Sequence, residues 1–483
     1  MAERFDLVIR NGTGVDGTRA PRFSADVGIR HGRVAAVGQL SAIPFDEEID
    51  ASGLVVAPGF IDAHTHDDRL MLSAPEMAPK VSQGVTTVVA GNCGVSLAPA
   101  PRGMPRPVTP PLDLLDDEGS WFRFPDFASY VEELSGRPAA TNCALLVGHT
   151  SLRVGVMDDL QRPARGDEIE RMQRLADEAL RAGAIGISTG LYYEPAAAAP
   201  TAEVIEVCRP LARHNGLYCT HMRDEGDRVI DSLEETFRIG RELGVPVVIS
   251  HHKVAGARNR GRSRETLPLI EQRMREQVVG LDCYPYCASS TILSASRVRV
   301  ASRVLVTWSK PHPEFNGMDL AEVAGTMQLS MEQAVQKLLP AGAIYFSMDE
   351  DDVQRILSFE HTMIGSDGLP HDAAPHPRLW GTFPRVLGHY ARTLKLFPLE
   401  TAVYKMTGLT ARTFGLEGRG VIREGAFADL TLFDAREVDE AATFARPVQA
   451  ARGVEKVLVN GAVVWQDGAP TGARPGQVLR RGR

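Results

Sequence analysis

Eight short apolar runs, each ending in polar residues, lie between Gly59 and Asp367. They are PGFIDAHTHD, VTTVVAGNCG, NCALLVGHTS, GAIGISTGLYY, GLYCTHMRD, VPVVISHHK, VGLDCYPY and TMIGSDG. Amphipathic stretches such as DEIERMQRLADEALRAG and DRVIDSLEETFRIGRELG separate them, with apolar residues three and four positions apart and a Gly near the end. Strands that alternate with helices predict a parallel sheet. Eight such units predict a TIM (β/α)8 barrel, whose chemistry lies at the C-terminal ends of its strands.

The two ends of the chain share a different pattern. FDLVIRNG, ADVGIRHGRVAAVG and GLVVAPGF at the start, and ADLTLFDA and EKVLVNGAVVWQDG near the close, alternate apolar and polar residues between Gly and Asp turns. This pattern is typical of antiparallel strands. We therefore expect residues 1–58 and 417–483 to pair into one small β-sandwich domain, and residues 59–416 to form the barrel.

A long segment separates the seventh and eighth predicted strands. Loops of this length are usually functional or disordered. Residues 287–341 contain apolar and helical material, such as SRVLVTWSKP and MEQAVQKLL, instead of low-complexity sequence. We interpret the segment as a lid insertion over the barrel mouth that shapes access to the site.

Composition narrows the partners. The 483 residues are 43% hydrophobic and 24% charged with a net charge of -8, which is ordinary for a globular protein and argues against nucleic acid as a partner. The start, MAERFDLVIRNG, lacks the features of a secretory signal, and no apolar run is long enough to span a membrane. A cytoplasmic protein without a membrane role is expected. Its six cysteines form no CxxC pair and are interpreted mostly as buried thiols.

Metal-competent side chains follow several of the predicted strands. His64 and His66 lie two residues apart on the first strand, so both imidazoles can face one ion. The others are His221, His251 and Asp367, which end the fifth, sixth and eighth strands. Each alone has a plainer interpretation, because His-x-His is often a polar surface feature, a lone His is often a hydrogen-bonded structural residue, and an Asp can cap a helix. Together they predict a metal site in the barrel mouth.

Two other histidines lie close to this predicted site in the sequence. His252 follows His251 directly and would face the opposite way from a strand, so a structural role is favoured for it. His149 ends the third strand and is a candidate to support the site from outside the ligand set.

The complete set of motifs resembles a known superfamily. PGFIDAHTHD, the later single histidines, the closing GSDG and the split β domain resemble the amidohydrolases over essentially the whole chain. GNCGVSLAP, THMRDEG, ISHHK, DCYPY, GSDGLPHDAAPHPRLWGTFPRVLGHY and KMTGLTA resemble, more narrowly, the D-aminoacylases (N-acyl-D-amino-acid deacylases). The resemblance implies hydrolysis of an N-acyl-D-amino acid, a small molecule, to a carboxylate and the free D-amino acid.

The resemblance also implies a set of metal ligands. Many amidohydrolases bridge two metals with a carbamylated lysine or a glutamate, which are missing from the expected place here, and the D-aminoacylase pattern assigns that position to Cys93. A thiolate suits zinc, which itself lowers the thiol pKa. The family pattern then implies a tight Zn²⁺ site made of Cys93, His221 and His251, and a weaker second site made of His64, His66 and Asp367.

Amide hydrolysis requires an activated water, a polarised carbonyl and a proton for the leaving nitrogen. Zinc would supply the first two, and Asp367 is the expected general base. Arg378 matches the α-carboxylate of the product because its planar fork fits carboxylate geometry. Lys253 and Tyr284 are further candidates for the same carboxylate, and Tyr192 is a candidate to hold the scissile carbonyl.

Other functions share much of this pattern. A hydantoinase-like enzyme would use a bridging lysine and a deaminase would need groups that bind a base ring, so Cys93 and Arg378 favour the acyl amino acid. Deacylases specific for D-glutamate or D-aspartate would keep all these residues, and a non-catalytic scaffold would have no use for a complete ligand set. Apolar Ile292, Leu293, Val298 and Val300 in the insertion favour neutral substrates. D-selectivity rests on the resemblance alone, and the sequence does not indicate an oligomeric state.

Overall fold

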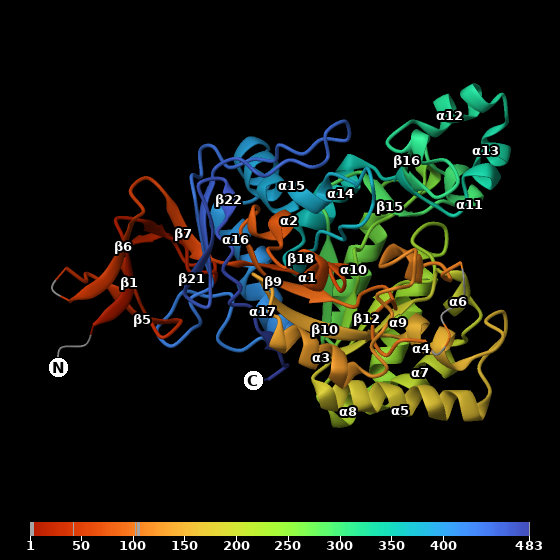
Figure 1. The fold of residues 1–483 in the computed structure, drawn as a ribbon, viewed down its shortest axis with the longest axis horizontal. Coiled ribbons are helices and arrows are strands. Elements are labelled where there is room, and N and C mark those ends of the chain that lie inside the picture. The colour runs from red at the N-terminus through yellow and green to blue at the C-terminus, as the bar shows by residue number, and fades with distance from the viewer. Residues whose placement is uncertain (1–3, 42, 102, 104–106, 483) are drawn as a thin grey trace.

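Eight parallel strands form the centre of the computed structural model, which describes residues 4–41, 43–101, 103 and 107–482 (Figure 1). In spatial order they are β8 (Phe60–Asp62), β9 (Val85–Ala90), β10 (Asn142–Gly148), β11 (Gly186–Gly190), β12 (Leu217–His221), β13 (Val247–Ile249), β14 (Val279–Cys283) and β18 (Thr362–Ile364). The first and last strands meet where Ala63 N donates to Ile364 O at 3.2 Å and Asp367 N donates to His64 O at 2.8 Å. The predicted TIM barrel is confirmed.

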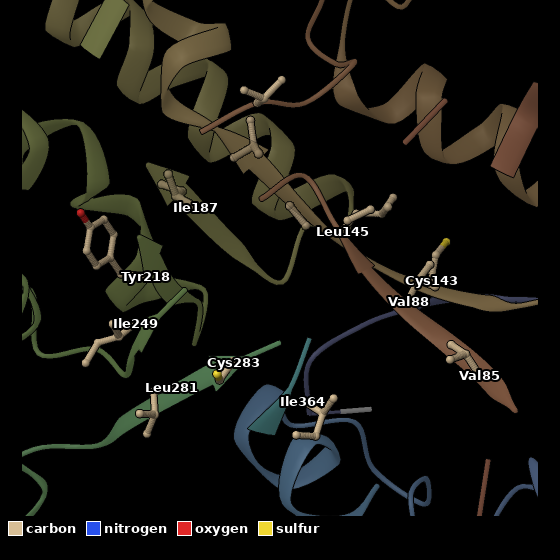
Figure 2. Close-up of a cluster of buried hydrophobic side chains, with 14 of the residues drawn as sticks. Val85, Val88, Cys143, Leu145, Ile187, Tyr218, Ile249, Leu281, Cys283 and Ile364 are labelled. Carbon is tan, nitrogen blue, oxygen red and sulfur yellow. The ribbon is translucent and has the colours of Figure 1, made fainter. Parts of the chain in front are cut away.

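Side chains alternate along the barrel strands between two separate cores. In β10, Cys143 and Leu145 belong to the large core between strands and helices, whereas Ala144 and Leu146 belong to the smaller core inside the barrel. Figure 2 shows the outer set, with Tyr218 of β12 and neighbouring residues pointing away from the barrel axis. A buried Leu or Ile contributes about 1.5–3 kcal/mol, so the two cores together fix the register of the strands.

The helices around the barrel begin and end where the sequence predicts. α5 (Gly166–Ala182) begins where the Glu168 side chain accepts a hydrogen bond from Arg165 N at 2.8 Å, and α9 (Val229–Leu243) ends at Gly244, which is left-handed at φ 66°. The other barrel helices include α3 (Phe127–Gly136), α4 (His149–Val156), α7 (Thr201–Cys208), α10 (Ser263–Met274), α14 (Glu350–Ser358), α15 (Arg378–Arg385), α16 (Leu399–Met406) and α17 (Gly408–Phe414).

Strands from both ends of the chain form two further sheets beside the barrel. One contains β5 (Arg33–Gly38), β4 (Asp26–Arg30), β1 (Phe5–Arg10) and β6 (Phe45–Asp50). The other contains β22 (Ala469–Pro470), β21 (Ala462–Gln466), β20 (Val454–Val459), β19 (Leu430–Phe433), β7 (Val55–Pro58), β2 (Thr13–Gly14) and β3 (Phe23–Ser24). A shared core that includes Ile9, Ile29, Leu430 and Leu458 packs the two sheets together as a sandwich. The domain boundaries at 58 and 417 stay predictions.

The segment between β14 and β18 is a small folding unit with its own core (Figure 1, upper right). It contains β15 (Ala288–Ile292), α11 (Ala295–Val298), β16 (Arg303–Ser309), α12 (Leu320–Met327), α13 (Met331–Leu338) and β17 (Ala341–Phe346), with its strands in one antiparallel sheet. Leu293 and Val298 lie inside this core. The boundaries of the lid insertion and its movement stay predictions.

One strand from the far end of the chain joins the barrel. β23 (Val478–Leu479) pairs in parallel with Cys143 and Ala144 of β10. Next to it, Gln477 N donates to the Asn142 side chain at 3.1 Å. Within the described residues, no helix is long and apolar enough to cross a membrane. The cytoplasmic location stays a prediction.

Candidate active site

Six side chains with metal-ligating atoms meet at the C-terminal end of the barrel. His64 and His66 follow β8, Cys93 follows β9, His221 ends β12, His251 follows β13 and Asp367 follows β18. All six are buried. The structure therefore brings every residue of the predicted ligand set into one cluster.

The cluster consists of two groups that share Cys93. In the first, Cys93 Sγ lies 3.6 Å from His221 Nδ1 and 3.3 Å from His251 Nε2, and these two nitrogens are 2.9 Å apart. In the second, Asp367 Oδ1 lies 3.3 Å from His66 Nε2 and 3.5 Å from His64 Nε2, which is 3.3 Å from Cys93 Sγ. Within each group the potential ligand atoms lie within 4.8 Å of one another.

The chemistry of these atoms fits metal binding. Cys93 Sγ faces three imidazole nitrogens, and an imidazole nitrogen can donate or accept a single hydrogen bond. Lone pairs that point toward one place without protons to separate them suit a cation. Sulfur with two imidazoles matches zinc, and two imidazoles with a carboxylate match a second divalent ion.

Three of the clustered residues have a left-handed backbone that non-glycine residues rarely adopt. Cys93 has φ 54°, His251 φ 38° and Asp367 φ 50°. Such conformations cost of order 1–3 kcal/mol each and concentrate at functional sites. Gly94 makes the first one possible, because a Cβ there would lie 2.6 Å from Thr150 Oγ1 and 2.7 Å from Gly190 N. The backbone thus turns sharply after these strands to direct the side chains inward.

Charges around the cluster favour ionised ligands. Burial alone would raise the pKa of Cys93, but His64 and His251 hold it well below its ordinary value. Burial would likewise raise the pKa of Asp367, yet the Arg378 guanidinium and a hydrogen bond from His66 hold that pKa well below its ordinary value. A thiolate and a carboxylate are therefore the forms present near neutral pH.

A buried glutamate that the sequence analysis did not single out orients the first group. Glu225 Oε1 lies 3.0 Å from His251 Nδ1, and Glu225 Oε2 lies 3.6 Å from His221 Nε2. Lys253 Nζ donates to Glu225 Oε1 at 2.6 Å. Asp282 has a similar place, since its Oδ1 accepts from His251 N at 3.0 Å and its Oδ2 lies 3.7 Å from His64 Nδ1. Carboxylates commonly orient metal-binding histidines in this way.

The three residues predicted to bind the substrate carboxylate lie together. The Tyr284 ring contacts Arg378, whose guanidinium carbon is 4.5 Å from the ring centre, and Lys253, whose Nζ is 5.5 Å from it. Arg378 is fully buried, and its Nη1 lies 2.9 Å from Asp367 Oδ2. Lys253 instead lines the cavity in front of the ligand cluster.

The two adjacent tyrosines after β11 have different surroundings. Tyr193 is buried, lines the cavity beside His221 and His251, and its hydroxyl lies 2.9 Å from Thr291 Oγ1. Tyr192, which was predicted to hold the carbonyl, lines a larger outer cavity. Arg297 of the insertion lines both cavities and lies over the Tyr192 ring at 4.1 Å.

The remaining two histidines lie outside the ligand cluster. His252 Nε2 pairs with Thr266 Oγ1 at 2.9 Å. His149 begins α4 and is fully buried, and its Nε2 lies 3.8 Å from Glu203. Burial, assisted by the charge of Arg153, lowers the pKa of His149 to about 3, so this imidazole is neutral.

Comparisons with known proteins agree with this geometry. A model of the amidohydrolase family matches residues 47–276 and 320–465. The D-aminoacylase of Alcaligenes xylosoxydans xylosoxydans is 60% identical over 99% of this chain and 98% of its own. A solved D-aminoacylase structure, described as having a binuclear metal centre with one-metal activation and second-metal attenuation, has 59% identity and a TM-score of 0.96 over 99% of this chain and all of that one.

A second solved structure brings in a ligand. The N-acyl-D-glutamate deacylase of Bordetella bronchiseptica, complexed with zinc and a phosphonate mimic of the tetrahedral intermediate, has 47% identity and a TM-score of 0.95 over 99% of this chain and all of that one. The chain therefore belongs to the amidohydrolase family and, within it, to the D-aminoacylases. It is an amidohydrolase enzyme, and the resemblance identified from the sequence is confirmed.

Proposed function

We propose that the protein hydrolyses N-acyl-D-amino acids to a carboxylate and the free D-amino acid, with zinc as the metal. The observation that carries the proposal is the convergence of Cys93, His221 and His251 in front of one cavity. A zinc ion held by these three residues would supply a Lewis acid and would lower the pKa of water toward about 7. A weaker second ion would be held by His64, His66 and Asp367. The D configuration is supported by the activity of the relatives.

The chain's own residues carry the proton and hold the substrate. Asp367, kept ionised by Arg378, takes the proton of the attacking water and returns it to the departing nitrogen. Lys253 and Arg378, on either side of Tyr284, bind the α-carboxylate. The carbonyl-binding role expected of Tyr192 passes to Tyr193, because the phenol of Tyr193 lines the inner cavity.

A second candidate is a deacylase for acidic D-amino acids. Of the four apolar residues that favoured neutral substrates, Leu293 and Val298 pack inside the insertion, and Val300 lines the outer cavity beside Arg297. A guanidinium between the two cavities would bind a side-chain carboxylate. Turnover of N-acetyl-D-glutamate above that of N-acetyl-D-methionine, lost in Arg297→Met, would favour this candidate, whereas the opposite preference would favour neutral substrates.

The proposal is tested by zinc content and by release of free amine from N-acetyl-D-methionine and N-acetyl-L-methionine. Wild type should bind zinc and act on the D substrate alone, and Cys93→Ala should lose both zinc and turnover. Cys208→Ala, which removes another fully buried thiol from α7, should keep both. Zinc retained by Cys93→Ala would contradict the ligand assignment, and zinc-loaded wild type without turnover of any acyl amino acid would contradict the substrate class.

A further inference from the structure

A fully buried lysine lies behind the His64, His66 and Asp367 group. Lys80, on α2 (Ala78–Val81), has no exposed surface. Its Nζ donates to Asp62 Oδ2 at 2.9 Å and to Ser366 Oγ at 2.9 Å, and lies 3.3 Å from Asp67 Oδ2. A charge removed from water costs several kcal/mol unless it is well paired. Three contacts to a buried ammonium therefore indicate a cluster built for a purpose beyond packing.

These contacts span the place where the barrel closes. Asp62 ends β8 and Ser366 follows β18, so Lys80 ties together the first and last strands. Asp62 Oδ1 adds to the connection, because it accepts from Ser366 N at 2.8 Å and from His64 N at 3.3 Å. Each residue of this cluster is adjacent to a candidate ligand or two positions from one.

The second ligand group depends on this closure more than the first does. His64 and His66 come from β8, whereas Asp367 comes from β18, so the group straddles the junction of these strands. The strands are held together there by the two backbone hydrogen bonds at Ala63 and Asp367 and by a bridge between Thr65 and Gly368. The first group lies on β9, β12 and β13, away from the junction.

The same short segment also holds the helix that carries Arg378. Gln83 Nε2 donates to Leu379 O at 2.8 Å, and Gln83 Oε1 accepts from Phe383 N at 3.2 Å. Residues 80–83 therefore connect both strand ends to the start of α15. We infer that Lys80, with Asp62, Asp67 and Ser366, is a positioning cluster that sets the metal affinity of the His64, His66 and Asp367 group. This inference rests on the proposed function, because it takes this group to be the weaker metal site.

The test is a zinc titration of metal-free protein against a chromophoric chelator, with Lys80→Met as the main variant. Loss of residues that orient ligands typically costs on the order of 10- to 100-fold in metal affinity. We expect such a loss at the weaker site, and a change below about threefold at the tight site. Ser366→Ala, which removes one of the three contacts, should shift the ratio of the two affinities in the same direction by a smaller factor.

The matched control is Lys405→Met. Lys405 is another buried lysine, which donates to Thr362 O at 3.4 Å at the opposite end of β18. Its loss should lower the melting temperature and leave the ratio of the two zinc affinities unchanged.

Several outcomes would overturn the inference. Equal losses at both sites in Lys80→Met, or no loss at either, would do so. If Lys80→Met does not fold, an unchanged ratio in Ser366→Ala overturns it. A wild-type chain that binds a single zinc equivalent would overturn it and leave the proposed hydrolysis standing, because the Cys93 site would still be filled.

Discussion

Replacement of Glu225 by Gln tests whether the buried carboxylate behind His221 and His251 orients the tight metal site. Gln keeps the shape of the side chain and removes its charge. The carboxylate now serves Lys253 at 2.6 Å and His251 Nδ1 at 3.0 Å through one oxygen, and faces His221 Nε2 at 3.6 Å with the other. A Gln carbonyl can accept from Lys253, but its amide group then donates toward His221 and no longer orients that ring as an acceptor would.

The size of the effect follows from these contacts. A hydrogen bond to a charged group contributes about 1.5–3 kcal/mol. Losing one such interaction with a ligand histidine corresponds to a roughly 10- to 100-fold lower zinc affinity. Lys253 would in addition lose its counter-charge beside His251, which disfavours a nearby cation. We therefore expect the tight-site affinity to fall toward the upper end of this range.

Competition between Glu225→Gln and a chromophoric zinc chelator measures this affinity. Glu235→Gln is the matched control, because Glu235 is a glutamate on α9 that pairs with Arg223 instead of a ligand. Its tight-site affinity should remain at the wild-type value. Wild-type affinity in Glu225→Gln, or the same loss in both variants, would refute the orienting role.

Three further variants probe other parts of the structure. Asp367→Asn should retain zinc at the tight site and lose on the order of 10²- to 10⁴-fold in kcat, since it removes the general base; near-normal turnover would exclude that role. His149 is neutral when folded, with a pKa of about 3, but titrates near 6.5 when unfolded. The unfolded chain therefore binds the extra proton first, and stability falls as the pH drops below about 6.5. Urea unfolding at pH 7.5 and 5.5 should show that His149→Gln abolishes about 1.4 kcal/mol of this loss, and an identical pH dependence in both proteins would contradict the assignment. Gly94→Ala should cost about 2–5 kcal/mol and reduce zinc content, whereas Gly53→Ala, also left-handed but with no atom within 4 Å of the added Cβ, should cost about 1–2 kcal/mol with zinc unchanged; equal effects would refute the argument from close packing.

The ligand positions could be predicted because they depend on local patterns. A strand places residues two apart on one face, which pairs His64 with His66, and parallel strands bring their C-terminal ends to one side of the barrel. Cys93 followed from the resemblance, not from its spacing. The predicted helices also end as expected, because Gly244 supplies the left-handed turn that closes α9.

Other parts of the site depend on contacts that no local pattern reveals. Glu225 and Lys80 are charged residues of the kind that usually lie on a surface, and the contact between Lys80 and Ser366 joins residues 286 positions apart. Tyr192 and Tyr193 are equivalent in the sequence, and the turn after β11 determines which one lines the inner cavity. Whether an apolar residue of the insertion faces a substrate or packs inside the unit depends on a fold of its own, as Leu293 and Val298 show.

Strand β23 places a constraint on the order in which the protein can fold during synthesis. Asn142, at the start of β10, accepts from Gln477 N across 335 residues of sequence. At a translation rate of about 5–20 residues per second, β10 therefore waits roughly 15–70 s for this partner to be made. During that interval the flank of β10 that pairs with β23 has unpaired backbone groups that can bind other strands. Slower synthesis lengthens this exposure, so the yield of folded protein should depend on the chaperones that attend the nascent chain.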